Sequence, residues 1–160
     1  NVYSERGRGT TFKMYLPRHV GRQVQTLDES GGKLPQSHGE TVLVVEDEVS
    51  LLKLASGILD RLGYTVLTAG TPGEAIRLVE EYAGEIHLLI TDVIMPEMSG
   101  KALVEKIRAT RPVTKNLFMS GYTANVIAQR GILDKGVQFI QKPFSMREIA
   151  AKVRTVLEKK

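Results

Sequence analysis

The stretch Val42-Leu43-Val44-Val45-Glu46-Asp47-Glu48 places three acidic residues directly after four aliphatic ones. A short apolar run of this kind, followed by a helical pattern, is typical of a buried parallel strand. In open α/β sheets, ligands bind at the carboxyl ends of the strands, near the point where the strand order reverses. The stretch therefore predicts an α/β domain with a charged site at one edge of its sheet.

Three more apolar runs each lead to a polar side chain. These side chains are Asp92, Ser120 and Lys142, which follow the runs 88–90, 117–119 and 137–141. Because the carboxyl ends of parallel strands meet at one edge of a sheet, we expect all three to gather beside Glu46 and Asp47. Carboxylates, a hydroxyl and an ammonium in one place suit a divalent cation and a phosphoryl group.

Strand and helix patterns alternate five times within residues 41–160. The expected strands are 41–46, 64–69, 87–91, 116–120 and 137–141, and the expected helices begin near 49, 72, 100, 124 and 146. Five such units with short connections predict a doubly wound, five-stranded parallel sheet with helices on both faces, in the flavodoxin-like order 2-1-3-4-5. The second strand ends without a charged residue, which is consistent with its place at the sheet edge.

The first 40 residues differ in composition from the rest of the chain. Residues 1–17 contain Gly7-Arg8-Gly9-Thr10 and then an alternating run at 11–16, which predicts one strand. Residues 18–40 hold few aliphatic side chains among Gly, Gln, Ser and charged residues. This composition is typical of a linker, so we expect the folded domain to span 41–160.

The overall composition excludes several classes of protein. The chain has 160 residues, of which 42% are hydrophobic and 25% charged, as in ordinary soluble domains. Cysteine is absent, so disulfides and thiolate metal sites are excluded. The net charge of +4 is spread along the chain, and no apolar run is long enough to span a bilayer. We therefore expect no nucleic-acid partner and no membrane contact.

The ordered set of motifs resembles the receiver domain of bacterial response regulators. The matching segments are 42–48, 90–100, 119–122 and 141–144, within a resemblance that covers about residues 40–158. The resemblance implies that Asp92 accepts a phosphoryl group from a phosphohistidine. Such a domain acts as a phosphorylation switch or relay module of two-component signalling, and it is not an enzyme beyond its own phosphorylation and dephosphorylation.

The resemblance also implies a metal and a water approach around Asp92. Asp47 and Asp92 would bind Mg²⁺ or Mn²⁺ directly, together with the backbone carbonyl of Ile94. Glu46 would act on the metal through water. Ile94 and Tyr122 would flank the path of the water that hydrolyses the phosphoaspartate. Neither side chain offers a carboxylate or an amide to hold that water, so we expect slow hydrolysis.

Three further residues are implied to respond to the phosphoryl group. Lys142 would pair with its oxygens, Ser120 would hydrogen-bond them in the active state, and Phe139 stands where the family has an aromatic switch. The residue after Lys142 is Pro143, and an X–Pro bond raises the chance of a cis peptide.

Residues 4–17 look like the end of a histidine-kinase ATP-binding domain, with its last glycine-rich box and final strand. The order of kinase tail, linker and receiver implies the C-terminal part of a hybrid sensor histidine kinase. The implied partners are a histidine kinase, a histidine phosphotransfer protein, or both, and a weak homodimer is left open. The implied location is cytoplasmic, with the parent kinase either anchored in a membrane or not.

Two other classes share parts of this pattern. A phosphatase of the haloacid dehalogenase type also forms an aspartyl-phosphate with Mg²⁺, but it carries two aspartates two residues apart on its first strand. Here Glu48 occupies the second of those places. A flavin-binding domain would need a phosphate-cradling loop after the first strand, where this chain has three acidic residues.

Overall fold

The chain divides into two units, each with its own internal contacts. The structure, a computed structural model, describes residues 2–15, 34–122 and 137–159, and the units are Asn1–Gly32 and Lys33–Lys160. The helix expected near 124–130 lies outside the described residues. In the described parts of the chain, no helix is long and apolar enough to cross a membrane.

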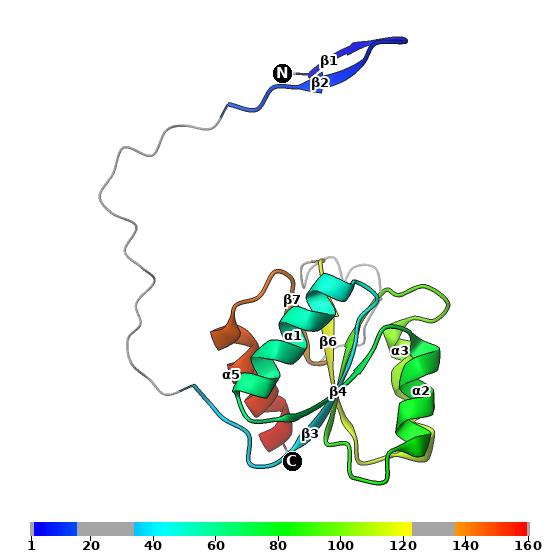
Figure 1. Ribbon diagram of the computed structural model, residues 1–160, viewed down its shortest axis with the longest axis vertical. Helices are drawn as coiled ribbons and strands as arrows, with labels where there is room; N and C mark the ends of the chain where they lie inside the picture. Colours follow the sequence, from blue (N-terminus) through cyan, green and yellow to red (C-terminus); the bar gives the residue numbers. More distant parts are fainter. Residues whose placement is uncertain (1, 16–33, 123–136, 160) are drawn as a thin grey trace, which may run out of the picture. The chain divides into compact units, whose positions relative to one another are not determined.

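The larger unit is built on a five-stranded parallel sheet (Figure 1). Its strands are β3 (Thr41–Val45), β4 (Thr65–Ala69), β5 (Leu88–Asp92), β6 (Lys115–Ser120) and β7 (Phe139–Gln141). The spatial order is β4-β3-β5-β6-β7, and β3 pairs with β4 on one side and β5 on the other. This order confirms the predicted 2-1-3-4-5 topology, in which the strand order reverses between β3 and β5.

Four described helices cover the two faces of the sheet (Figure 1). They are α1 (Val49–Arg61), α2 (Pro72–Glu81), α3 (Gly100–Thr110) and α5 (Met146–Glu158). Successive side chains of β3 alternate between the faces. Val42 and Val44 join the core under α1 and α5, whereas Leu43 and Val45 join the core under α2 and α3. The aliphatic run is therefore buried on both faces, as a central parallel strand requires.

Side-chain caps mark the starts of α2 and α5, at the positions near 72 and 146 that the sequence predicted. The Thr71 hydroxyl accepts a hydrogen bond from the Glu74 N–H at 3.1 Å, with Pro72 at the first position of α2. Ser145 and Glu148 form a complete capping box at the start of α5. Each cap satisfies backbone donors that the first helical turn leaves without partners, so local sequence sets where these helices begin.

The larger unit begins earlier than the position 41 expected from composition. Leu34 packs against the core beneath α1 and α5. The Ser37 N–H donates to the Leu62 carbonyl at 2.8 Å, which satisfies a carbonyl at the end of α1. Residues 34–40 thus belong to the folded unit that starts at Lys33, and only the earlier part of the expected linker precedes it.

The smaller unit contains a two-stranded antiparallel hairpin. Its strands are β1 (Val2–Glu5) and β2 (Gly9–Phe12). Gly7 in the connecting turn and Gly9 at the start of β2 have φ of 84° and 87°. The prediction of one strand at 11–16 is wrong in its extent: the strand starts at Gly9, ends at Phe12 and has a partner. Alternation from Phe12 onward suggested more strand, but cross-strand pairing with β1 ends at that residue.

Candidate functional site

Four neighbouring strands bring the polar residues to one edge of the sheet. Asp92 ends β5 and Ser120 ends β6, while Glu46 directly follows β3 and Lys142 directly follows β7. Because β3, β5, β6 and β7 run parallel, their carboxyl ends lie at the same edge. This is the edge at which open α/β sheets bind ligands, next to the reversal of strand order.

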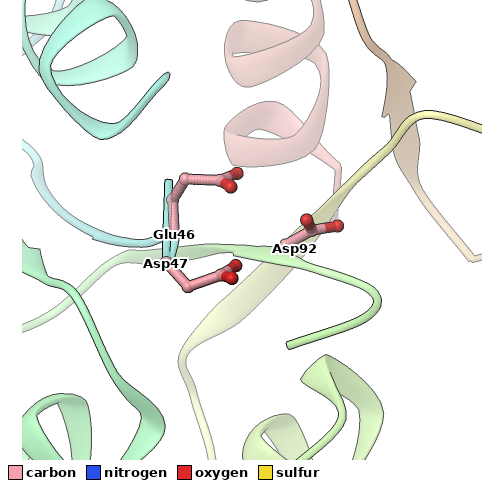
Figure 2. Close-up of side chains that lie close together, drawn as sticks. All are labelled: Glu46, Asp47 and Asp92. Carbon is pink, nitrogen blue, oxygen red and sulfur yellow. The ribbon is translucent and has the colours of Figure 1, made fainter. Parts of the chain in front are cut away.

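Three carboxylates converge at this edge (Figure 2). Glu46, Asp47 and Asp92 each offer one oxygen, and these oxygens lie within 4.8 Å of one another. Glu46 is buried, Asp92 is partly buried and Asp47 is exposed. The cluster therefore reaches from the interior of the sheet edge to solvent on the Asp47 side.

The Lys142 ammonium lies between two of these carboxylates. Its Nζ is 2.8 Å from Asp92 Oδ2 and 2.5 Å from Glu46 Oε2. The side chains of Lys142 and Glu46 are only 13% and 2% exposed. One partly buried ammonium thus donates to both the residue that ends β5 and the residue that follows β3.

Burial and neighbouring charges act in opposite directions on the pKa values of Lys142 and Glu46. Burial by itself would lower the pKa of Lys142, but hydrogen bonds to Asp92 and Glu46 outweigh it, and the pKa is raised. Burial raises the pKa of Glu46, and the opposing effect of Lys142 does not fully cancel it, partly because Asp92 adds negative charge nearby. Lys142 is therefore held as an ammonium, while Glu46 sits in an unfavourable field for a carboxylate.

Ser120 connects the ends of β6 and β7. The residue is buried, and its hydroxyl oxygen accepts a hydrogen bond from the Tyr122 N–H at 3.0 Å. Its carbonyl accepts from the Lys142 N–H at 2.7 Å. The peptide bond between Lys142 and Pro143 is cis, the isomer whose chance the proline raised. Ser120 thus holds the backbone of Lys142 through its carbonyl, and its hydroxyl lies at the same edge of the sheet.

One aliphatic and two aromatic residues were also expected to take part in the site. Ile94, two residues beyond Asp92, is 55% exposed, and Tyr122 is 41% exposed. Phe139 is partly buried in β7 and packs against the core under α2 and α3. The exposed side chains are thus on the loops after β5 and β6, whereas Phe139 belongs to the sheet.

The donor set fits a hard divalent cation. All the side-chain ligands that the cluster offers are carboxylate oxygens, the atoms that Mg²⁺ and Ca²⁺ prefer. Three carboxylates against one ammonium leave two negative charges in a small volume. A cation bound there would relieve the repulsion between the acidic groups.

Sequence reasoning missed the contact between Glu46 and Lys142. These residues are 96 positions apart, and β5 and β6 lie between the strands that carry them. The sequence assigned Glu46 to a metal through water and Lys142 to a phosphoryl group. Motif spacing alone contains no signal for this pairing, because it depends on how far one long side chain reaches across the sheet edge.

The chain belongs to the response regulator receiver domain family, whose family model matches residues 42–154. Among curated proteins, the sensor kinase CckA of Brucella abortus (strain 2308) is 37% identical over 163 residues. This match covers 98% of the present chain but 17% of that kinase. The DNA-binding transcriptional regulator NtrC of Azospirillum brasilense is 30% identical, over 73% of the chain and 24% of the regulator. The chain therefore spans less than a quarter of either relative.

Solved structures that resemble this chain include members of the same family. A crystal structure of the receiver domain from the hybrid histidine kinase CckA matches with a TM-score of 0.62 at 36% identity, covering 74% of this chain and 99% of that one. The chemotaxis protein CheY4 of Vibrio cholerae matches with a TM-score of 0.65 at 25% identity, covering 74% and 98%. The larger unit is thus a receiver domain of two-component signalling with the CheY-like fold.

Proposed function

We propose that Asp92 accepts a phosphoryl group from a phosphohistidine, and that this chain is the receiver module of a hybrid histidine kinase. The observation that supports the proposal most directly is the surroundings of Asp92. It ends a central strand, shares a cluster with two further carboxylates, and has the Lys142 ammonium 2.8 Å from its Oδ2. A nucleophilic carboxylate with a cation beside it suits phosphoryl transfer, because charge develops on the transferring oxygens.

The proposed metal is Mg²⁺, or Mn²⁺ in its place, held by Asp47, Asp92 and the Ile94 carbonyl, with Glu46 acting through water. Its contribution when bound would be to neutralise charge on the phosphoryl oxygens. Asp47 supports this assignment, because it is the exposed member of the cluster and can meet a hydrated ion. Few protein ligands are on offer, so we expect weak binding.

In the proposed step, an Asp92 carboxylate oxygen attacks the phosphorus of the donor histidine. The new oxygen–phosphorus bond forms as the phosphorus–nitrogen bond breaks, and the bonding electron pair returns to the imidazole nitrogen, which is protonated by solvent. Lys142 then has a phosphoryl oxygen to pair with in place of Asp92 Oδ2. Its second contact, with Glu46, keeps the ammonium at the sheet edge during this exchange.

The proposed switch follows from the new charge. A phosphoryl group on Asp92 adds acceptor oxygens beside the end of β6. The Ser120 hydroxyl, which accepts from the Tyr122 N–H, can donate its own proton to such an oxygen. That movement would pull on the loop after β6, and Phe139, which is paired with Phe118 in the neighbouring strand, would respond through packing.

The proposed parent protein is a hybrid sensor kinase with residues 1–17 as the end of its ATP-binding domain. The similarity to the Brucella sensor kinase extends over 98% of the chain, and so includes this segment as well as the receiver. The proposed partners are a histidine kinase or a histidine phosphotransfer protein in the cytoplasm, with weak self-association as a secondary property. The NtrC match covers only 24% of that regulator, so its DNA binding is not carried over to this chain.

Intact-mass measurement after incubation with acetyl phosphate and Mg²⁺ tests the proposal. We expect one phosphoryl group on the parent chain, none on Asp92→Asn, and none when EDTA removes the metal. Asp60→Asn, which changes an exposed aspartate on α1, is the matched control and should label like the parent. Undiminished labelling of Asp92→Asn would refute the assignment of the acceptor.

The same experiment distinguishes a receiver domain from a phosphatase. A receiver keeps the phosphoryl group, whereas a phosphatase of the haloacid dehalogenase type would release phosphate repeatedly. Continuous release of inorganic phosphate in many-fold excess over protein would favour the enzyme. One stable phosphoryl group per chain would favour the receiver, which carries out only its own phosphorylation and dephosphorylation.

A further inference from the structure

Gly100 lies against the backbone of Asp92. It is the first residue of α3 and is buried. A Cβ atom added at Gly100 would lie 2.0 Å from the carbonyl oxygen of Asp92 and 3.2 Å from Cγ2 of Thr91. Cβ atoms essentially never lie closer than 3.0 Å to such an atom, so a side chain at Gly100 would require the strand end or the helix to move by about 1 Å or more.

The contact between α3 and the end of β5 is also hydrogen-bonded. The Gly100 N–H donates to the Val93 carbonyl at 3.0 Å. The Ser99 hydroxyl accepts from the Ala102 N–H at 3.3 Å and so caps the same turn. In turn, the Val93 N–H donates to the Met119 carbonyl at 3.0 Å. The first turn of α3 is therefore connected through Val93 to β6, and it presses directly on the peptide that carries Asp92.

We propose that Gly100 is a positioning residue for the acceptor carboxylate. Its missing side chain lets α3 approach closely enough to fix the Asp92 backbone, and with it the distance from Asp92 Oδ2 to Lys142 Nζ. The inference rests on the proposed function of Asp92. Misplacement of a reacting group by about 1 Å can cost about 100-fold in rate, so a small shift here has a large chemical effect.

The chain offers a matched glycine for comparison. Gly73 lies in the first turn of α2, as Gly100 does in α3. A Cβ at Gly73 would meet only the Thr71 hydroxyl oxygen, at 4.0 Å. Gly73→Ala therefore makes the same chemical change in the same part of a helix without a clash. Any general effect of alanine in a first helical turn appears in both variants.

The test compares Gly100→Ala and Gly73→Ala by two measurements. The first is the initial rate of Asp92 phosphorylation by acetyl phosphate in Mg²⁺. The second is the rise in melting temperature that Mg²⁺ produces, which reports metal affinity without any phosphoryl transfer. We expect Gly100→Ala to lose about 100-fold in rate and most of the Mg²⁺-induced rise, and Gly73→Ala to keep both. If Gly100→Ala unfolds in buffer, the same comparison is made in sucrose, which favours the folded chain.

Two outcomes would contradict the two proposals separately. A Gly100→Ala protein that is less stable but keeps the parent rate and the parent response to Mg²⁺ would overturn the inference, because the glycine would then be structural only. A parent chain that responds to Mg²⁺ but accepts no phosphoryl group would refute the proposed function. In that case the Mg²⁺ response of the two alanine variants would still decide whether Gly100 positions Asp92.

Discussion

Two glutamates flank β3, and they have opposite environments. Glu40, just before the strand, accepts hydrogen bonds from the Ser37 hydroxyl at 2.8 Å and the His38 N–H at 2.6 Å, and it pairs with Arg154 at 2.8 Å. Burial raises its pKa, but these donors outweigh burial and lower the pKa to about 2. Glu46, just after the strand, has a raised pKa, because burial is only partly offset by Lys142.

Each cation is shared by two carboxylates, and the difference lies in how well the second carboxylate is solvated. Arg154 also pairs with Glu158, at 3.0 Å, but that carboxylate is 63% exposed and well solvated. Lys142 is shared with Asp92, whose charge adds directly to the field at Glu46. One end of the strand is thus electrostatically satisfied and anchors the fold. The other end keeps excess negative charge at the edge where ligands bind, which is typical of a functional site.

Removal of the shared cation should have the largest effect. Lys142→Met takes away the ammonium that faces Asp92, and we expect phosphorylation by acetyl phosphate to slow about 100-fold. Arg154→Met removes the cation at the other end of β3 and should leave the rate within about twofold. Initial rates of labelling, measured by intact mass, check both. Equal slowing in the two variants would mean that the ends of β3 do not differ in function.

Truncation of the chain before β3 should show that the residues at this end of the strand stabilise the fold. A chain that begins at Lys33 should unfold at the same urea concentration as the full chain. One that begins at Thr41 loses the Glu40–Arg154 pair and the packing of Leu34, and we expect a loss of about 2 kcal/mol in the free energy of unfolding. Its phosphorylation rate should stay unchanged. Equal stability of the two truncated chains would show that residues 34–40 contribute nothing to the fold.

Changes at the exposed rim should alter the lifetime of the phosphoaspartate without altering stability. Ile94→Asn combined with Tyr122→Glu supplies polar groups that can hold water, so we expect the phosphoryl group to decay about 10-fold faster. The decay is followed by intact mass after the donor is removed. Val113→Asn changes another exposed aliphatic residue, in the loop before β6, and is the control. A double variant that decays no faster than the parent would contradict the shielding role.

The smallest effect is expected in the pH dependence of stability. The pKa of Glu40 is about 2 in the folded chain and near 4.5 when unfolded. Its contribution is therefore fully present above about pH 5 and is lost as the pH falls toward 2, because the unfolded chain takes up the proton first. We expect Glu40→Gln to remove about 1 kcal/mol of this dependence, since the pair is near the surface. Urea unfolding at about pH 6 and about pH 3 checks this, and identical slopes in parent and variant would contradict it.

The arrangement of the sheet could be read from the chain because its signals are local. Runs such as 42–45 and 88–90 are aliphatic throughout, which is required of strands buried on both faces. Caps at Thr71 and Ser145 mark helix starts by hydrogen bonds that span only three residues. Polar residues at strand ends then predicted a common site, because parallel strands must end at the same edge.

The composition of the segment before β3 did not predict where the folded unit begins. Residues 34–40 look like the rest of the linker, yet they belong to the folded unit. What holds them is a small number of contacts with distant residues: Leu34 with the core, Ser37 with Leu62, and Glu40 with Arg154. A linker composition does not reveal such contacts, because each depends on a partner far along the chain.

By itself, the sequence determined the α/β class, the strand order, the gathering of Asp92 with Glu46 and Asp47, and the family. These depend on periodicity and on which residues end each strand. Only the tertiary structure decided that Lys142 bridges Glu46 and Asp92, and that α3 approaches the Asp92 carbonyl too closely for any side chain at Gly100. Contacts of this kind depend on distances of a few ångströms between separate elements, and those distances are set by packing.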